Sequence, residues 1–378
     1  MGHLIAHPTK KRENTVSKET ITEDGTFAAA EKRSNAIWEK LKVDPSGFRM
    51  LTGDRPTGSL HIGHYFGTLA NRVRLQNLGL ETFVVIADYQ VLTDRDSVEK
   101  ISENVREIIL DYLAAGLDPF DKNTVIFAHS HIPELNQLLL PFLTLVSVAE
   151  LERNPTVKEE VKQANIKSMS AAMLSYPVHQ AADILFCKGN VVPVGKDQLP
   201  HLEITRKIAR RFNERFCAEN PVFPMPSALL AEVPHILGLD GNAKMSKSLN
   251  NAVFLKWSAD ETAKAFKKAK TDSQRQITYE PETRPEIANL LRLLSLTTDK
   301  SPEQWAEQIG DGGGGTLKQA VTDHLNEYFA PMRQKRQELE ADPDIVTKVL
   351  KMGNEKAREE AAKTLNDVRS VMNMNYSL

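Results

Sequence analysis

Two short motifs in this chain place histidines and lysines where they could act on phosphate groups. The sequence His-Ile-Gly-His occupies residues 61–64, and Lys-Met-Ser-Lys-Ser occupies residues 244–248. The α-phosphorus of a nucleoside triphosphate gains negative character when a nucleophile attacks it. Imidazole donors at a helix start and ammonium groups on a separate loop would stabilise that charge. Each motif alone could arise by chance, but together and in this order they predict activation of a carboxylate by ATP.

The residues around the first motif predict a strand followed by a turn and a helix. Residues 48–53 form a short run that ends at a glycine, and residues 61–78 follow helical periodicity up to another glycine. His61 and His64 are three positions apart, so they share one helix face. Gly63 lacks a Cβ atom, so a flat base could lie directly against the backbone. We therefore expect His61 and His64 to be catalytic and all three residues to contact a nucleotide.

The second motif has the composition of a mobile loop. A glycine, an asparagine and an alanine precede Lys244, and serines flank Lys247 on both sides. A loop that brings a lysine over a leaving pyrophosphate requires such mobility. Removing a donor of this kind costs about 3–4 kcal/mol of transition-state stabilisation. We predict that Lys244 and Lys247 are catalytic and bind ATP together with Ser246.

A third group of polar residues lies between the two motifs. Residues 176–183 read Tyr-Pro-Val-His-Gln-Ala-Ala-Asp, and residues 195–198 read Gly-Lys-Asp-Gln. Asp183 is followed directly by Ile-Leu-Phe, and a carboxylate at the edge of apolar surroundings needs a donor. From the residues alone, two interpretations remain open: an ion pair within one helix, or acceptance of an N–H group from a ligand.

The order of the predicted elements indicates an α/β fold. Short apolar runs at 48–53, 82–87, 124–128 and 190–194 have the length of buried strands and alternate with helical stretches. This alternation predicts a doubly wound parallel sheet, in which ligands bind at the carboxyl ends of strands. Residues 255–378 show helical patterns only. The four glycines at 312–315 are interpreted as a flexible connection, because no Lys-Ser or Lys-Thr pair follows them as in a phosphate loop.

The bulk composition excludes several classes of protein. The 378 residues carry 48 basic and 50 acidic side chains, so no global positive field indicates DNA binding, and any RNA contact must be local. The cysteines Cys187 and Cys217 stand far apart without a CxxC pattern, which argues against disulfide, zinc or iron–sulfur frameworks and fits a reducing compartment. No run is long and apolar enough for a membrane span. His129 and His131 alternate near a strand end, but without a third ligand nearby we predict no metal site.

Four segments carry a resemblance to a known family. They are residues 53–64 (Gly-Asp-Arg-Pro-Thr-Gly-Ser-Leu-His-Ile-Gly-His), 176–185, 192–206 and 244–248. With these segments the chain resembles the class I aminoacyl-tRNA synthetases, and within that class the bacterial tryptophanyl enzymes. The similarity covers nearly everything after residue 47. It implies a Rossmann-like catalytic domain at 48–254 with a helical insertion, a helical anticodon-binding region at 255–378, and an N-terminal extension at 1–47 that is partly flexible.

The resemblance also implies roles for individual residues. The ATP-binding set is Gly53, Arg55, His61, Gly63, His64, Asp197, Lys244, Ser246 and Lys247. Tyr176 and Gln198 would hold the α-amino group of tryptophan, and Asp183 would accept its indole N–H. Gln180 would also line this substrate pocket. The implied partners are ATP with Mg²⁺, L-tryptophan and tRNA(Trp), in a cytoplasmic homodimer that binds neither membrane nor DNA.

Two features depart from the family pattern, and three alternatives accompany the interpretation. Gln180 stands where many bacterial tryptophanyl enzymes have methionine, and a glutamine there is also similar to tyrosyl enzymes. Residues 255–378 contain no cysteine, so the iron–sulfur cluster of some relatives is not expected. The alternatives are a tyrosyl-tRNA synthetase, a small-molecule adenylyltransferase of the HxGH type, and a synthetase paralogue that does not charge tRNA. The lysine motif and the long helical C-terminus argue against the adenylyltransferase.

Overall fold

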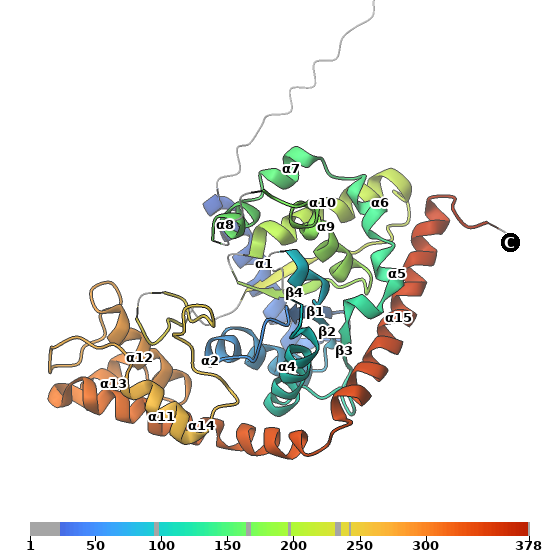
Figure 1. The fold of residues 1–378 in the computed structure, drawn as a ribbon. Helices are drawn as coiled ribbons and strands as arrows, with labels where there is room; N and C mark the ends of the chain where they lie inside the picture. Colours follow the sequence, from blue (N-terminus) through green and yellow to red (C-terminus); the bar gives the residue numbers. More distant parts are fainter. Residues whose placement is uncertain are drawn as a thin grey trace, which may run out of the picture.

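A computed structural model describes residues 23–93, 98–163, 168–195, 198–230, 236–241 and 243–376. At its centre lies a five-stranded sheet in which all neighbouring strands are parallel (Figure 1). The strand order is β3-β2-β1-β4-β5, with bounds β1 Arg49–Asp54, β2 Glu81–Ile86, β3 Thr124–Ala128, β4 Val191–Val194 and β5 Ser227–Leu230. The predicted α/β parallel sheet is thereby confirmed. The strand β5 was not predicted from the sequence, because its four residues lack a long apolar run.

The helices that surround the sheet fall into two sets along the chain. The first set is α1 (Glu23–Val43), α2 (Ile62–His64), α3 (Ala70–Asn77), α4 (Ile101–Ala115), α5 (Pro133–Asn136), α6 (Leu139–Leu143), α7 (Val148–Glu152), α8 (Pro155–Gln163), α9 (Ala171–Leu185) and α10 (Leu199–Phe216). The second set is α11 (Ala259–Lys267), α12 (Pro285–Leu296), α13 (Pro302–Ile309), α14 (Gly313–Glu340) and α15 (Ile345–Val371). A π-helical turn, Tyr65–Leu69, joins α2 to α3. No helix of the described ranges is both long and apolar enough to cross a membrane.

Several predicted helix boundaries were wrong, and local caps explain the differences. Helical periodicity in the sequence predicts helices at 28–43, 134–151, 158–186, 343–352 and 354–373. In the described part of residues 133–186, five shorter helices stand where two long ones are predicted. Ser147 caps a new helix by accepting the Glu150 N–H, and Ser170 caps the next long one by accepting the Met173 N–H. The glycines at 312–315 are not a loop, since α14 begins at the second of them. The helix α1 begins at residue 23 rather than 28.

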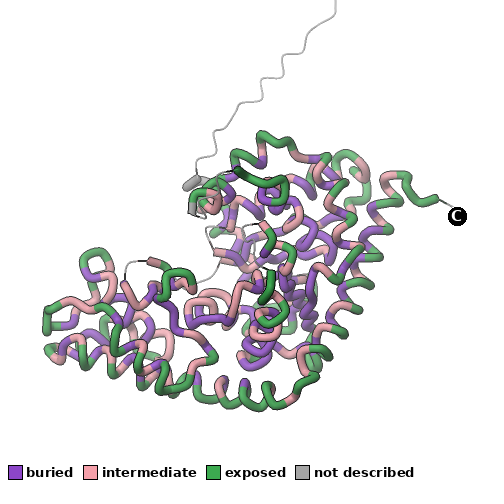
Figure 2. Tube along the Cα trace, viewed as in Figure 1, coloured by how far each residue is buried: buried purple, intermediate pink, exposed green. Residues whose placement is uncertain are grey.

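The two faces of the sheet bury separate hydrophobic cores. On one face, Val84, Ile86 and Ile126 pack against α4 and the helical C-terminal region. On the other face, Phe83 and Phe127 pack against α9 and α10. Side chains of successive strand residues point to opposite faces, so the continuous apolar runs of β2 and β3 supply both cores. Figure 2 shows the buried residues gathered around the sheet, with the outer sides of α14 and α15 exposed.

The two edge strands of the sheet are covered by the first and the last helix. At one edge, α15 packs along β3, and the Ala128 N–H donates to Asn354 Oδ1 at 3.0 Å. A Cβ atom on Gly353 would lie 1.8 Å from the Ile126 carbonyl oxygen, so only glycine permits this approach. This contact explains why α15 runs unbroken through residue 353, where two helices were predicted. At the other edge, α1 packs along β5, and the Leu230 N–H donates to a serine hydroxyl, Ser34 Oγ, at 3.0 Å.

A buried ion pair links α14 to α4, a helix beside the central sheet. Arg336 donates to Asp111 Oδ1 of α4 at 2.5 Å and to Glu107 Oε2 at 2.9 Å. The other carboxylate oxygen of Asp111 accepts the Leu60 N–H at 2.9 Å, and Glu107 accepts the Ser59 hydroxyl at 3.0 Å. The turn before the His-Ile-Gly-His motif is therefore bonded, through two carboxylates of α4, to a helix more than 200 residues away.

Candidate functional site

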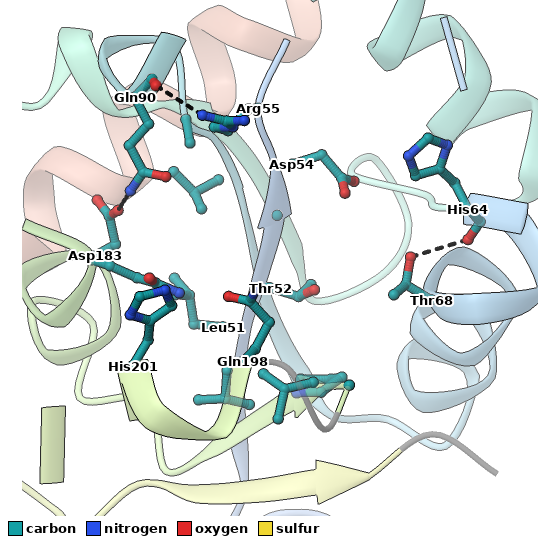
Figure 3. Close-up of a pocket in the computed structure, with 18 of the residues that line it drawn as sticks. Leu51, Thr52, Asp54, Arg55, His64, Thr68, Gln90, Asp183, Gln198 and His201 are labelled. Atoms are coloured by element: carbon teal, nitrogen blue, oxygen red, sulfur yellow. Dashed lines mark hydrogen bonds between the residues drawn. The ribbon is translucent and has the colours of Figure 1, made fainter. Parts of the chain in front are cut away.

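A pocket of about 480 Å³ opens at the carboxyl ends of the strands (Figure 3). Its floor is made by residues of β1 and by the ends of β2 and β4, and helices α3, α9 and α10 contribute side chains to its walls. Figure 3 shows Asp183, Gln90 and His201 at one end of the pocket and His64 with Thr68 at the other. This is the position at which a doubly wound sheet binds its ligands.

The two histidines of the first motif each accept a hydrogen bond from the backbone of the other. The His61 N–H donates to His64 Nδ1 at 3.2 Å, and the His64 N–H donates to His61 Nδ1 at 3.3 Å, so that each ring caps the other's backbone. Burial, the neighbouring His64 and the nearby lysines lower the pKa of His61 to about 2. Burial is also the first cause that lowers the pKa of His64 to about 4. Both rings are neutral at pH 7, and each therefore carries its proton on Nε2.

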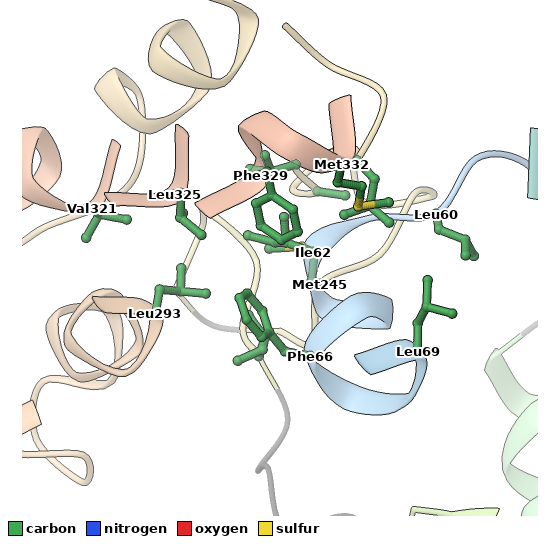
Figure 4. Close-up of a cluster of buried hydrophobic side chains, with 14 of the residues drawn as sticks. Leu60, Ile62, Phe66, Leu69, Met245, Leu293, Val321, Leu325, Phe329 and Met332 are labelled. Carbon is green, nitrogen blue, oxygen red and sulfur yellow. The ribbon is translucent and has the colours of Figure 1, made fainter. Parts of the chain in front are cut away.

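Hydrophobic contacts fix the helix that carries these histidines. Ile62 and Phe66 are buried in one cluster with Met245 of the second motif and with Phe329 of α14 (Figure 4). A Cβ atom on Gly63 would lie 3.0 Å from His61 Nδ1 and 3.4 Å from the Met245 Cβ. Gly63 thus allows the His61 ring and the second motif to pack closely. The sequence predicted a different reason for a glycine here, namely the approach of a flat base to the backbone.

The second motif lies beside the first and is held by specific contacts. Met245 is only 3% exposed. The Ser246 N–H donates to Asn251 Oδ1 at 2.8 Å, and Lys247 Nζ donates to the Gly58 carbonyl at 2.6 Å. The methionine anchors the segment, while Lys244 and Lys247 on either side of it line the pocket. The mobility of this loop stays a prediction.

A buried triad at the end of β1 was not found from the sequence. Asp54 Oδ2 accepts Arg72 Nη1 at 2.5 Å and the Tyr112 hydroxyl at 2.6 Å, and Arg72 also donates to the Gly53 carbonyl at 3.1 Å. Burial raises the pKa of the Asp54 carboxyl, but the Arg72 guanidinium outweighs it and holds the pKa well below its usual range. A charged residue directly after an apolar strand was a usable signal for Asp54. Nothing in the sequence indicates its partners.

At the opposite end of the pocket, Asp183 is almost fully buried and has partners from other elements. Gln90 Nε2 lies 3.4 Å from Asp183 Oδ2, and His129 Nδ1 lies 3.3 Å from Asp183 Oδ1. The interpretation of Asp183 as part of an ion pair within its own helix was therefore wrong. Arg55 reaches the same end, where its Nη1 lies 3.4 Å from the Gln90 carbonyl oxygen.

A relay of hydrogen bonds orients Tyr176. Asn154 Nδ2 lies 3.2 Å from His201 Nδ1, and the Tyr176 hydroxyl lies 2.8 Å from His201 Nε2 and 2.7 Å from Glu160 Oε2. If the asparagine amide donates to Nδ1, the ring carries its proton on Nε2 and donates to the tyrosine, which donates in turn to the glutamate. Neither His201 nor Glu160 was singled out from the sequence, although both line the pocket.

The pair His129 and His131 does not form a shared face. His129 is completely buried and His131 is exposed, because a short 3₁₀ turn follows β3 at this point. Among the described residues, one group of three could hold a metal ion, namely His129, His179 and Asp183. Its hydrogen bonds are considered below.

Comparisons with known proteins identify the family. The model of the family "tRNA synthetases class I (W and Y)" matches residues 45–330. The chain is 44% identical over 338 residues to a tryptophan–tRNA ligase of Clostridium longisporum, and the match covers 86% of this chain and 97% of that protein. The chain belongs to the tryptophan–tRNA ligase family.

Two further members of the tryptophan–tRNA ligase family extend this result. The ligase of Streptococcus pyogenes serotype M1 is 43% identical, and the match covers 86% of this chain and 98% of that protein. A crystal structure of the Campylobacter jejuni enzyme, complexed with ADP and tryptophan, superimposes with a TM-score of 0.73 at 32% identity. That match covers 86% of this chain and the whole of the other. The predicted class I fold is confirmed. The helix α1 lies before the range that the family model matches.

The structure brings most of the predicted site residues of this ligase-family protein to one pocket. The predicted residues that line it are Gly53, Arg55, His64, Tyr176, Gln180, Asp183, Gln198, Lys244 and Lys247. Three predicted residues do not line the pocket, namely His61, Gly63 and Ser246. They lie directly behind or beside residues that line it. Asp197 lies outside the described residues.

Proposed function

We propose that the protein activates L-tryptophan with ATP and transfers it to tRNA(Trp). The carboxylate of tryptophan attacks the α-phosphorus in line, the bond to the leaving oxygen breaks, and pyrophosphate departs. The terminal ribose hydroxyl of the tRNA then attacks the acyl carbon of the adenylate, and AMP departs. One observation carries this proposal. A single pocket joins the two phosphate-binding motifs to a buried carboxylate, in a chain that matches nearly the whole length of a tryptophan–tRNA ligase.

The phosphate end of the pocket is built to stabilise charge that develops on the nucleotide. In our proposal His64 donates its Nε2–H to a phosphate oxygen, and His61 keeps the His64 ring in that tautomer. Lys244 and Lys247 neutralise the departing pyrophosphate. Positioned donors and charges of this kind are sufficient for such a transfer, so no side chain has to form a covalent bond to the substrate.

The family implies Mg²⁺, and the residues present fit a metal ion that is carried by ATP. Among the described lining residues, the carboxylates are Asp54, Glu160 and Asp183. Asp54 is bonded to a guanidinium and a phenol, and the other two lie at the amino-acid end. The phosphate end thus presents cationic and neutral donors rather than metal ligands. We propose that phosphate oxygens hold the Mg²⁺, which supplies further neutralisation of charge.

The other end of the pocket supports recognition of tryptophan. Asp183 is 1% exposed, and a buried carboxylate without its donor is penalised. We propose that Asp183 accepts the indole N–H, while Tyr176 and Gln198 hold the α-amino group and Gln180 lines the side of the ring. A phenylalanine side chain offers no N–H, so it would be rejected by more than the loss of contact area.

The remaining parts of the proposal concern the tRNA and the assembly. We propose that the helical region at 255–378 contacts the anticodon, that Asp197 lies near the ribose of ATP, and that two copies of the chain form a dimer bridged by tRNA. We also propose a cytoplasmic location, where tRNA is charged. The chain matches nearly the whole length of two tryptophan–tRNA ligases, and this similarity supports these points.

Pyrophosphate exchange tests the proposed function directly. The purified protein is incubated with ATP, labelled pyrophosphate and each of the twenty amino acids in turn, without tRNA. We expect exchange with tryptophan and far less with tyrosine or phenylalanine. Exchange driven by tyrosine alone would favour the tyrosyl alternative, and no exchange with any amino acid would favour an adenylyltransferase of another kind. Charging of tRNA(Trp) then separates a ligase from a paralogue that only forms the adenylate.

A further inference from the structure

His129 lies directly behind the carboxylate that faces the substrate pocket. It stands at the end of β3 and is completely buried, and it does not line the pocket. Its Nδ1 is 3.3 Å from Asp183 Oδ1, and its Nε2 is 2.7 Å from the Tyr89 backbone nitrogen and 3.1 Å from Asp88 Oδ1. The imidazole therefore bridges the loop after β2 and the helix α9.

The backbone of Tyr89 determines the tautomer of this ring. An amide nitrogen has a hydrogen to donate and no lone pair to accept one. The Tyr89 N–H is shared between His129 Nε2 and Asp88 Oδ1, and its close approach to Nε2 requires that this nitrogen carry no proton. Asp88 needs no proton from His129, because it accepts the Tyr89 N–H at 3.0 Å, the Ser130 N–H at 3.1 Å and the Ser130 hydroxyl. An imidazolium would place a second hydrogen against the Tyr89 N–H. The neutral ring thus carries its proton on Nδ1, where it faces Asp183.

We propose that His129 is a positioning residue for substrate selection, which donates its Nδ1–H to Asp183 Oδ1 and so leaves Oδ2 for the indole N–H. This inference rests on the proposed function, in which Asp183 recognises tryptophan. Gln90 Nε2, 3.4 Å from Oδ2, donates to that same oxygen, which has a second lone pair for the indole N–H. Without His129, the carboxylate would be free to rotate about its χ2 angle, and the acceptor would no longer be fixed before the substrate binds.

The same geometry argues against a metal ion at this cluster. His129, His179 and Asp183 offer ligand atoms within 4.8 Å of one another. A metal would require the lone pair of His129 Nδ1, which carries a proton in the tautomer that Tyr89 fixes. His179 is engaged elsewhere, since its Nε2 lies 2.8 Å from Asn136 Oδ1. His129 and Asp183 thus form a hydrogen-bonded support for the pocket, and the His179 ring packs against the His129 ring.

An isosteric substrate isolates the contribution of the N–H group. In 3-benzothienylalanine a sulfur atom replaces the indole N–H, so the ratio of kcat/KM for tryptophan to kcat/KM for this analogue reports recognition by Asp183. Pyrophosphate exchange is measured for the wild type, His129→Leu and His129→Asn. We expect His129→Leu to lower the ratio about tenfold, which corresponds to the loss of one hydrogen bond to a charged group. His129→Asn keeps an N–H near the position of Nδ1 and should retain the ratio within about threefold.

The outcomes distinguish a positioning role from a structural one. A matched control, His131→Leu, changes the exposed neighbour and should leave the ratio unaltered. If His129→Leu lowers kcat/KM for both amino acids by the same factor, the inference is overturned. A wild type that exchanges with neither amino acid would instead overturn the proposed function, and this inference with it. Stoichiometric Zn²⁺ bound by the wild type and lost in His129→Asn would replace the hydrogen-bonded support by a metal site.

A spectroscopic measurement reads the tautomer in the wild type itself. With ¹⁵N-labelled histidine, the ring nitrogens of His129 are assigned by their absence in His129→Asn. We expect the chemical shifts of the neutral tautomer that is protonated on Nδ1. A ring protonated on Nε2, or on both nitrogens, would contradict the proposal.

Discussion

Replacement of Arg336 by methionine should destabilise the protein by about 3–5 kcal/mol at pH 7.5, because it leaves a buried carboxylate without its cation. The Arg336 side chain is 4% exposed and that of Asp111 is fully buried, with 2.5 Å between Nη1 and Oδ1. Methionine fills a similar volume, so little of the loss comes from a cavity. After the substitution, the Leu60 N–H still donates to Asp111 Oδ2, but the carboxylate has lost its guanidinium partner.

The loss should depend on pH in a defined direction. Burial is the first cause that raises the pKa of Asp111 to about 6, and Arg336 opposes it. For an acid whose pKa is raised by folding, the folded state binds the proton more tightly, so stability falls as the pH rises from the ordinary value near 4 to about 6. In Arg336→Met this pKa rises further, and the fall continues to higher pH. The deficit of the variant therefore shrinks as the pH is lowered from 7.5 towards 5.

Urea unfolding at fixed protein concentration, at pH 7.5 and pH 5.5, measures both effects. Arg358→Met is the matched control, because Arg358 pairs with Glu134 on the surface, where water and salt screen the attraction. In the double variant Arg336→Met with Asp111→Asn, the amide oxygen still accepts the Leu60 N–H without a buried charge. We expect more than half of the lost stability to return. The reasoning is refuted if Arg336→Met is no worse than Arg358→Met, or if the double variant is as unstable as the single one.

Three further predictions concern the pocket and the sheet edge. Lys247→Met should lower the single-turnover rate of adenylate formation by roughly 10²–10³-fold while the KM for tryptophan changes little, since the lysine acts on developing charge. Tyr176→Phe removes a hydroxyl that bridges a histidine and a carboxylate, so the KM for tryptophan in pyrophosphate exchange should rise about tenfold with the KM for ATP unchanged. Gly353→Ala should cost about 1–3 kcal/mol in urea unfolding, because its Cβ would meet the Ile126 carbonyl, whereas Gly315→Ala, with open space around its Cβ, should be neutral or stabilising.

The sequence predicted the elements whose signal is local. The continuous apolar run at 124–128 coincides with β3. Long helical patterns were less informative, since their periodicity continues across caps that start a new helix. The strand β5 has only four residues, and its place in the sheet depends on pairing with β4 rather than on its own pattern. The position of such a short strand is set by tertiary contacts, which the local sequence pattern does not display.

For the site, the sequence indicated the residues that line the pocket better than those that support them. His64, Lys244 and Asp183 stand in motifs whose residue types reveal their chemistry. Arg72 and His129 carry no such signal, because their roles follow from partners that lie 18 and 54 positions away. Strand order decides which loops meet, and a single sequence does not display that order. The tautomers of the histidines likewise depend on backbone groups from other segments.

The helices that lie along β3 and β5 have a consequence for how copies of this chain behave towards one another. The outer strand of an open sheet offers N–H and C=O groups that can pair with a strand from a second molecule, and this is a route to aggregation. Here Asn354 and Ser34 each engage one of those N–H groups, and the helices that carry them block the approach of another chain. The family match begins at residue 45, after α1. The helix that covers β5 thus lies before the part of the chain that the family model matches, whereas β5 itself lies within it.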